Sequence, residues 1–470
     1  MRSRPLVIAC SAVIAGLGAA TISPVEAAAA PRIDEARHEQ ALDILRKSIG
    51  FRTVKDGGQT PAYAQYLKDV LVSAGFAAED IRIEPVGTTA IMIARYRGTD
   101  SAKKPIVING HMDVVEAHAQ DWERDPFTAV VEKGYVFGRG SVDNKFDVSM
   151  VTATLAHLKH SGWKPGRDVV LALSGDEETE MMSTRKLAQE LKGAELVLNA
   201  DAGGGLLSEE NQPIIYGIQA AEKVYADFTL TVTDAGGHSS RPGKANAIYQ
   251  LARALERLER YEFPAMQNEI TRAYFEASAK NVAPELADAM KRFVANPTDA
   301  KAIETLSADR EYVGQVRTTC VATMIQGGHA ENALPQRATA NVNCRIFPGT
   351  PIASVQRTLA TVIADPGVNV AQAGSSSVEG EPSPLRPDVI AAVTQAVHAS
   401  YPKVQLVPNM SAGATDSMHF RALGIPSYGV SGLFMKPSDD FTHGLNERVP
   451  VAAIDVSLTH WDTLLRALAR

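Results

Sequence analysis

The chain of 470 residues has three cysteines, no excess of basic residues and, beyond its N-terminal segment, no apolar run long enough to cross a bilayer. So few cysteines exclude a disulfide-dense scaffold and a cysteine-rich zinc module. Lys and Arg number 47 against 54 Asp and Glu, a net charge of -7, so no positive excess is left for a nucleic-acid partner. The hydrophobic content of 45% is ordinary for a globular protein, and the length predicts two or three domains.

The N-terminal segment is typical of a secretory signal peptide. Arg2 and Arg4 give it a basic start, residues 6–20 are apolar, and Val25-Glu26-Ala27 is a small-x-small cleavage pattern. An anchor helix is the alternative, but the apolar stretch is short and wrongly flanked for one. We therefore expect residues 1–27 to be removed, leaving a secreted or periplasmic protein that has no contact with the membrane.

Buried strands alternate with amphipathic helices in the first half of the chain. Continuous apolar runs at 105–109 and 168–174 are typical of strands covered on both faces. Apolar residues at helical spacing predict helices over 35–49, 62–74, 148–160 and 183–191. This alternation predicts an α/β fold with helices on both faces of a sheet, and such sheets bind ligands at the carboxyl ends of their strands.

The pattern changes near Glu222. Residues 223–233 alternate apolar and polar side chains, as in a strand with one solvated face. A helix, a polar helical stretch, two antiparallel strands, a second helix and a last strand follow, which is the order of a small α+β domain. We therefore expect an inserted domain over 222–382, with a helical insert at 263–310, and a catalytic domain built from 32–221 and 383–470.

Cys320 and Cys344 fall on the two antiparallel strands predicted at 318–326 and 337–347. Pairing these strands places the two cysteines nearly opposite each other. A cross-strand disulfide, which an oxidising compartment would permit, and a pair of small buried hydrophobic residues are both open.

Five polar clusters follow the predicted strands or lie in a late loop. They are G-H-M-D-V-V at 110–115, G-R-G-S-V-D-N-K at 138–145, S-G-D-E-E-T-E at 174–180, N-A-D-A-G-G-G at 199–205 and T-H-G-L-N-E at 442–447. Each alone has a plain structural explanation, such as a buried His, a helix cap or a solvated acidic turn. Together they offer two His and three carboxylates, a donor set suited to two divalent ions, zinc first. One carboxylate must then bridge the ions, because five side chains serve two coordination shells.

With these motifs, and with W-E-R-D-P-F at 122–127 and G-G-H-S-S-R-P at 236–242, the sequence resembles a known family. It is the co-catalytic zinc metallopeptidase family of carboxypeptidase G, carboxypeptidase S, aminoacylase and succinyl-diaminopimelate desuccinylase. The motifs occur in family order, and the resemblance extends from about Glu35 to the end of the chain. It implies a zinc-peptidase-like mixed sheet interrupted by a lid and dimerisation domain that hinges near Glu222 and Gly380.

The resemblance also implies two zinc ions per subunit, for which Co²⁺ or Mn²⁺ could substitute, and a role for each matching residue. Asp143 would bridge the ions. The terminal ligands would be His111 and Asp201 on one ion and Glu178 and His443 on the other. Asp113 would orient His111, and Glu177 would be the general base that takes a proton from the attacking water.

Three residues of the inserted domain match family positions that contact the substrate. His238 would reach the active site of a partner subunit and stabilise the oxyanion, although a loop-capping imidazole is the structural alternative. Asn332 and Arg345 would contact substrate, and Arg345 suits a bidentate grip on a carboxylate. The helical insert could instead cover the dimerising face and leave His238 to act within its own subunit.

From these residues we expect a secreted, homodimeric di-zinc hydrolase that cleaves an amide bond of short peptides or N-acyl amino acids, as a carboxypeptidase or dipeptidase does. Asp201 stands where family deacylases usually have Glu, which favours peptides. The alternatives are an N-acyl-amino-acid deacylase and a peptide-binding protein without catalysis. The second is disfavoured because Glu177 and every predicted ligand are present.

Overall fold

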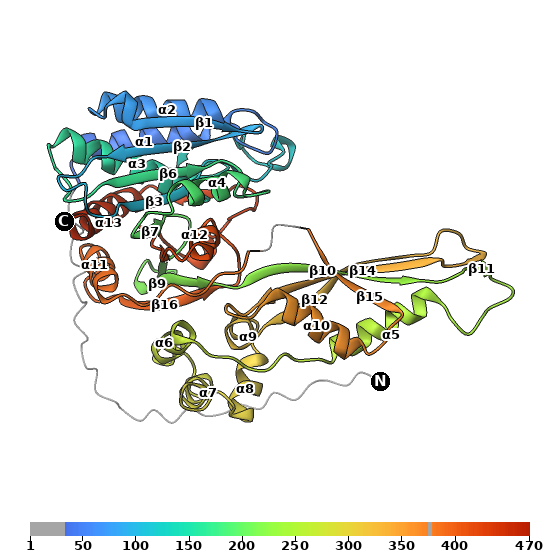
Figure 1. Cartoon of the computed structure of the whole chain (residues 1–470). Helices are drawn as coiled ribbons and strands as arrows, with labels where there is room; N and C mark the ends of the chain where they lie inside the picture. Colours follow the sequence, from blue (N-terminus) through green and yellow to red (C-terminus); the bar gives the residue numbers. More distant parts are fainter. Residues whose placement is uncertain (1–32, 375–377) are drawn as a thin grey trace, which may run out of the picture.

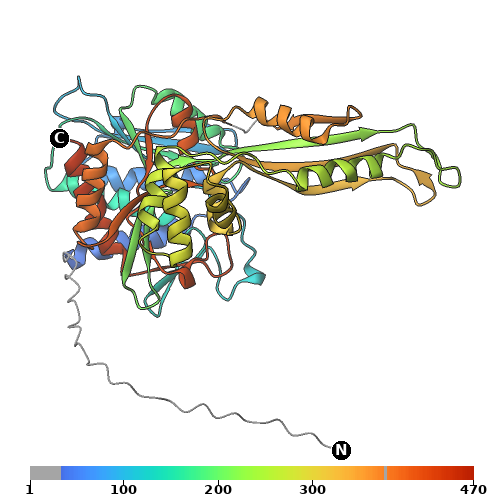
Figure 2. The ribbon, with the colours of Figure 1, turned by 90° about the horizontal axis from the view of Figure 1, so that it is seen from below.

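Two separate sheets organise the computed structural model of the chain, which describes residues 33–374 and 378–470. The large sheet has ten strands, and the small sheet, of four strands, extends away from it as an arm (Figures 1 and 2). The expected signal peptide lies outside the described residues. Among the described residues, no helix has the length and apolar character to cross a membrane.

The large sheet is mixed, as predicted. Its strand order is β1-β2-β6-β3-β7-β17-β9-β8-β18, and β16 pairs with β9. The neighbours β6, β3, β7 and β17 run parallel, whereas β2 is antiparallel to β6 and β9 is antiparallel to β17. The strands are β1 (Ile81–Val86), β2 (Thr89–Tyr96), β3 (Ile106–His111), β6 (Val169–Ser174), β7 (Leu196–Asn199), β8 (Gly204–Leu207), β9 (Pro213–Glu222), β16 (Gln405–Ser411), β17 (Ser427–Gly429) and β18 (Phe434–Met435).

Helices cover both faces of the large sheet. Successive side chains of a strand point to opposite faces, so Ile106 and Ile108 of β3 join one buried core and Val107 joins the other. The first core includes α1 (Glu35–Ile49), α2 (Thr60–Ser73), α3 (Lys145–His160), α11 (Pro387–His398) and α13 (Ala453–Leu468), and the second includes α4 (Met182–Glu190) and α12 (Ser417–Ala422). The prediction of a sheet buried on both faces is therefore confirmed.

A small three-stranded sheet ties two distant loops of this domain together. It has the order β19-β5-β4, so Arg448–Pro450 lies beside Tyr135–Phe137. Its strands are β4 (Val130–Glu132), β5 (Tyr135–Phe137) and β19 (Arg448–Pro450). Three short 3-10 helices also belong to this domain, η1 (Ala78–Asp80), η2 (Ala119–Asp121) and η3 (Pro437–Asp439). As a result the loop after β5 and the loop before β19 lie next to each other.

The arm is the predicted α+β domain. Its antiparallel sheet has the order β12-β14-β10-β15, and the chain visits it as strand, helix, two strands, helix and strand. Its elements are β10 (Val224–Thr233), α5 (Ala247–Glu259), β12 (Thr319–Gly327), β14 (Arg337–Ile346), α10 (Ile352–Ile363) and β15 (Val368–Ala373), and β11 (Gly237–His238) pairs with β13 (Ala333–Leu334) at its tip. Alternate residues of β10 are buried against α5 and α10. The exact domain limits stay a prediction.

The helical insert joins the base of the arm to the large sheet. Its helices are α6 (Glu269–Ser278), α7 (Pro284–Ala295), α8 (Ala300–Ser307) and α9 (Arg310–Val316), with a core of their own around Phe275 and Phe293. Ile270 of α6 is buried in the core of the catalytic domain, and Gln315 Nε2 donates to the Met410 carbonyl at 2.7 Å. The insert therefore bridges the two parts of the chain.

Cys320 and Cys344 are directly opposite each other on β12 and β14 and are joined by a disulfide. Of the two open alternatives for these cysteines, the structure has the disulfide. It connects the edge strand of the arm to the next strand at the end nearest the catalytic domain.

His460 of α13 gives the stability of the fold a pH dependence. Its imidazole is buried, its Nε2 donates to the Val430 carbonyl at 2.9 Å, and burial lowers its pKa to about 4. The unfolded chain binds a proton there near pH 6.5 and the folded chain does not. The contribution of His460 to the free energy of unfolding is therefore fully present above pH 6.5 and is lost as the pH falls towards 4.

We predict that His460→Gln flattens the acid limb of the stability profile. Each pH unit between 6.5 and 4 costs the wild type up to about 1.4 kcal/mol through this group. Denaturant titrations at pH 6.5 and 4.5 measure the difference, with the exposed His118→Gln as control. If His460→Gln and His118→Gln lost the same free energy of unfolding between pH 6.5 and 4.5, the pH dependence could not be assigned to His460.

Candidate metal centre

The five predicted ligands come from strand ends and from the two adjacent loops. His111 is the last residue of β3, Glu178 follows β6 and Asp201 follows β7. These three strands are parallel neighbours, so their carboxyl ends meet at one edge of the sheet. Asp143 lies just before α3, and His443 lies in the loop before β19.

Asp143 lies between the two histidines and offers one carboxylate oxygen to each. His111 Nε2 is 2.8 Å from Asp143 Oδ1, and His443 Nε2 is 3.1 Å from Asp143 Oδ2. Each imidazole also meets one further carboxylate, His111 at 3.2 Å from Asp201 Oδ1 and His443 at 3.0 Å from Glu178 Oε1. The side chains thus form two groups that share Asp143, a geometry that fits two bridged metal ions.

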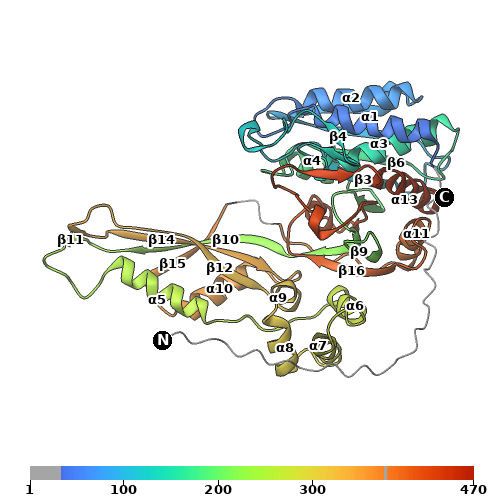
Figure 3. The same cartoon turned by 180° about the vertical axis from the view of Figure 1, so that it is seen from behind.

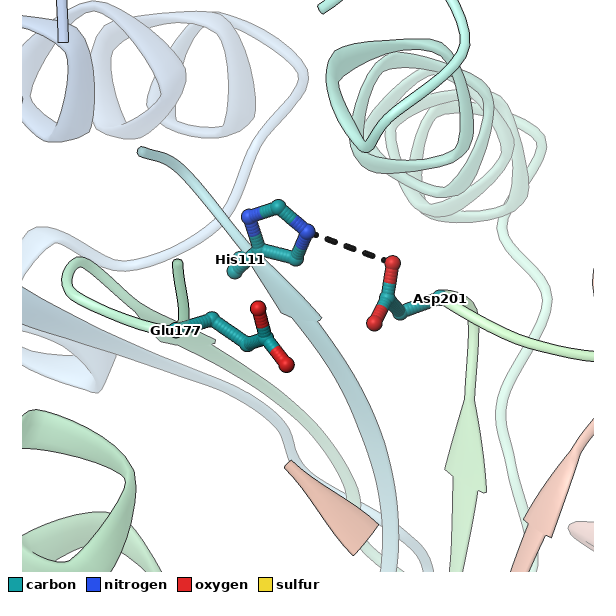
Figure 4. A group of neighbouring side chains, drawn as sticks. All are labelled: His111, Glu177 and Asp201. Carbon is teal, nitrogen blue, oxygen red and sulfur yellow. Dashed lines mark hydrogen bonds and ion pairs between the residues drawn. The ribbon is translucent and has the colours of Figure 1, made fainter. Parts of the chain in front are cut away.

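Glu177 completes the cluster. Ligand atoms of His111, Glu177 and Asp201 lie within 4.8 Å of one another, and Figure 4 shows the Glu177 carboxylate pointing towards the space between the other two. Its side chain is buried, and burial together with the neighbouring Asp201 raises the pKa of Glu177 well above its ordinary value. Burial thus favours the protonated form of this carboxyl group, which can hold a proton and release it again.

Several groups of the centre have raised pKa values, so in the absence of metal they hold protons. Burial raises the pKa of Asp201 to about 7, and hydrogen bonds to Asp143 and Glu178 raise the pKa of His443 to about 10. Burial lowers the pKa of His111, but its carboxylate neighbours outweigh this and raise it. Metal ions bind neutral imidazole, so loading the site would replace these protons with metal charge.

Asp113 contacts both His111 and the Glu177–Glu178 backbone. The His111 Nδ1–H lies 3.0 Å from the Asp113 carbonyl oxygen, an arrangement that leaves Nε2 free to face the centre. The Asp113 carboxylate accepts from the backbone N–H groups of Glu177 at 3.1 Å and Glu178 at 3.0 Å. That Asp113 orients His111 stays a prediction. Its contacts also include the backbone of Glu177 and Glu178.

Two of the three predicted lid residues lie far from this centre in the same chain. His238 belongs to β11 and Asn332 precedes β13, at the tip of the arm and away from the ends of β3, β6 and β7 (Figures 1 and 3). They are neighbours, since Ser239 N–H donates to the Asn332 carbonyl at 3.0 Å. His238 Nδ1 accepts from the Ser240 N–H at 3.1 Å, a contact of the loop-capping kind.

Arg345 lies near the opposite end of the arm. Its guanidinium group donates to the Ala412 carbonyl of the catalytic domain at 3.1 Å and covers the ring of Tyr225, 4.8 Å from the ring centre. Within one chain the structure therefore separates Arg345 from His238 and Asn332.

Asp416 is a buried residue near the centre whose contacts the sequence did not reveal. Its carboxylate accepts from Asn109 Nδ2 at 3.0 Å, from Ser174 Oγ at 2.6 Å and from Thr184 Oγ1. Asn109 and Ser174 lie at or near the ends of β3 and β6, so Asp416 fastens the two strands beneath the centre. It stands in the segment G-A-T-D-S at 413–417, and no spacing in the sequence connects this segment to β3 or β6.

A cavity of about 410 Å³ opens beside Asp143 and Asp201. Its wall combines glycines and apolar side chains, such as Leu206, Ile215 and Leu433, with polar ones, such as Asp147, Asn409 and Asp440. The cavity therefore has apolar and polar surface in similar amounts beside the centre.

Sequence comparisons place the chain among known hydrolases. The model of the peptidase family M20/M25/M40 matches residues 107–467. The chain is 28% identical over 452 residues to the N-fatty-acyl-amino acid synthase/hydrolase PM20D1 of Xenopus tropicalis, covering 92% of this chain and 86% of that protein. It is 26% identical over 430 residues to the probable carboxypeptidase S-like 2 of Dictyostelium discoideum, covering 87% and 81% respectively.

Solved structures share the fold at lower identity. The M20 family metallo-carboxypeptidase Sso-CP2 of Sulfolobus solfataricus has a TM-score of 0.70 and 20% identity, covering 92% of this chain and 99% of that one. Human carnosine dipeptidase 1 has a TM-score of 0.60 and 16% identity, covering 93% and 98% respectively. Both alignments extend over the catalytic part and the arm.

We predict that the purified protein binds close to two equivalents of zinc per chain. Asp143→Ala should weaken binding more than Glu178→Ala, because only Asp143 contacts both histidine groups. Elemental analysis after gel filtration gives the metal content, and treatment with a strong chelator should abolish hydrolysis. Full activity in metal-free protein would contradict a two-metal centre.

Proposed function

The chain belongs to the peptidase family M20/M25/M40, and we propose that it is a di-zinc exopeptidase or amidohydrolase acting on short peptides or N-acyl amino acids. The observation that carries this proposal is the sharing of Asp143 between two histidine groups, with the buried Glu177 beside them. The comparisons support a hydrolase of this family.

In this proposal His111, Asp143, Glu178, Asp201 and His443 hold the two ions. Bound metal would acidify water and polarise the scissile carbonyl group. Glu177 accepts the proton of the attacking water and later delivers it to the leaving nitrogen. Burial of its side chain favours the protonated form that the second task requires.

The substrate carries a free carboxylate and an apolar group. Arg345 supplies a guanidinium group at the edge between arm and catalytic domain, where it can grip a carboxylate in two places. The apolar side chains of the cavity beside Asp201, Leu206, Ile215 and Leu433, can contact a side chain or an acyl chain of the substrate. Peptides and N-acyl amino acids both meet this description, and the curated relatives include hydrolases of the second class.

The working unit in this proposal is a homodimer formed by the arms. β12 is an edge strand, and its residues Val321, Met324 and Ile325 are each more than half exposed, as is Tyr249 on the adjacent α5. A long apolar edge strand invites pairing with a second chain. The helical insert lies at the base of the arm (Figure 2), so it leaves this edge open, and His238 at the tip is free to reach a partner subunit.

We also propose that the protein is exported. The N-terminal sequence has the pattern of a signal peptide, and the disulfide between Cys320 and Cys344 would persist in an oxidising compartment but not in a reducing one. Periplasmic or secreted protein would then carry the disulfide and lack residues 1–27.

A substrate panel with zinc-loaded protein tests the reaction and its class. Dipeptides and N-acyl amino acids with the same C-terminal residue are compared with their C-terminal amides, which the Arg345 grip predicts to be poor substrates. Glu177→Gln should keep the metal and lower turnover by about 10²–10⁴-fold, since it removes the proton carrier. Near wild-type turnover in that variant, or no hydrolysis of any panel member, would overturn the proposal.

Subunit mixing tests whether His238 acts across the dimer. His238→Ala and Glu177→Gln should each be nearly inactive, yet their mixture should recover up to about a quarter of wild-type activity, because one hybrid site keeps both groups. Mixing Glu177→Gln with the Glu177→Gln/His238→Ala double variant is the control. Absence of recovery after subunit exchange, or a fully active monomer, would count against this arrangement.

A further inference from the structure

Arg139 and Glu447 form a buried ion pair that the proposed chemistry does not use. Arg139 Nη1 lies 2.6 Å from Glu447 Oε2, and the side chains are only 3% and 0% exposed. Arg139 belongs to the G-R-G-S-V-D-N-K motif and Glu447 to the T-H-G-L-N-E motif, each of which also carries a proposed metal ligand. A buried ion pair contributes little net stability, because the loss of solvation offsets the attraction between the charges. Its role must therefore be sought in its other contacts.

The Glu447 carboxylate holds the backbone of the loop that presents Asp143. One oxygen accepts from the Val142 N–H at 2.7 Å and the Asp143 N–H at 3.2 Å. The other accepts from the Gly140 N–H at 3.0 Å as well as from Arg139. The loop around Asp143 therefore closes around this carboxylate.

The Arg139 guanidinium group holds the loop that presents His443. Its Nη2 donates to the carbonyl oxygens of Gly444 at 3.1 Å and His443 at 3.4 Å. His443 has a backbone φ of 61°, a conformation that residues other than glycine need outside contacts to keep. Arg139 itself is covered by the ring of the buried Trp122, 5.1 Å from its ring centre.

The two histidines differ in how firmly the fold holds them. His111 is 1% exposed at the end of a central strand, whereas the His443 side chain is 52% exposed on a loop. The position of His443 relative to Asp143 therefore depends on the ion pair, while that of His111 depends on the sheet.

We propose that Arg139 and Glu447 are positioning residues that set the spacing of Asp143 and His443 and so govern the affinity of the ion that His443 binds. The inference rests on the proposed function, because it takes these two residues as ligands. Neither Arg139 nor Glu447 is one of the proposed ligands, and both act through the loops that carry Asp143 and His443. When the pair is broken, the site at His111 should still fill at low metal concentration, whereas the site at His443 should stay empty.

Metal titration of the apo mature protein, which lacks residues 1–27, tests this inference. Zn²⁺ is added to wild type, Glu447→Gln and Arg139→Lys in competition with a chromogenic chelator. In both variants the second equivalent should bind roughly 10- to 100-fold more weakly than in wild type, with the first nearly unchanged. Arg139→Lys keeps the positive charge beside Glu447 but loses the second nitrogen, which bonds the carbonyl oxygens of the His443 loop. If Glu447→Gln does not fold, Arg139→Lys alone provides the test.

The matched control is Glu195→Gln. It breaks the partly buried ion pairs with Arg167 and Arg386 just before β7, at the end of that strand opposite Asp201. This variant should lose thermal stability as the others do but bind both equivalents as wild type does. Wild-type affinity for the second equivalent in folded Arg139→Lys, or an equal loss in Glu195→Gln, would overturn the inference. A wild-type protein that binds fewer than two equivalents would instead overturn the proposed function.

Discussion

The mutual repulsion of carboxylates at one edge of the large sheet is the constraint on which the rest of the structure depends. Asp143, Glu177, Glu178 and Asp201 share a space with only two imidazoles, and the fold must hold them there against repulsion and burial. Three further carboxylates hold the backbone that carries them. Asp113 and Glu447 accept from the N–H groups of the ligand loops, and Asp416 accepts from side chains of β3 and β6 beneath the centre.

This support comes from elements that are far apart in the sequence. Asp416 precedes α12 yet binds side chains of β3, β6 and α4, and Thr415 beside it donates through its N–H to Glu222 at 2.7 Å. The place where the chain leaves the catalytic domain is therefore bonded to the loop beneath the metal centre. A centre assembled in this way requires the complete fold, including the C-terminal segment after the arm.

Local patterns in the sequence predicted the parts of the fold that local forces decide. The apolar runs at 105–109 and 168–174 became β3 and β6, and the alternation at 223–233 became β10. β8 was missed because Gly204 and Gly205 have no side chains that could show a period. The ligand set followed from motif resemblance, whereas the contacts of Glu447 and Asp416 depend on partners hundreds of residues away, and no spacing reveals them.

The helical insert changes how the arm can move. The chain passes between the catalytic domain and the arm after Glu222 and again before Ser383, and two such crossings alone would act as a hinge. Ile270 of α6, buried in the catalytic core, and Gln315, bonded to Met410, add a third attachment. A swing of the arm about the two crossings would therefore have to break these contacts or bend the segments that join the insert to the arm.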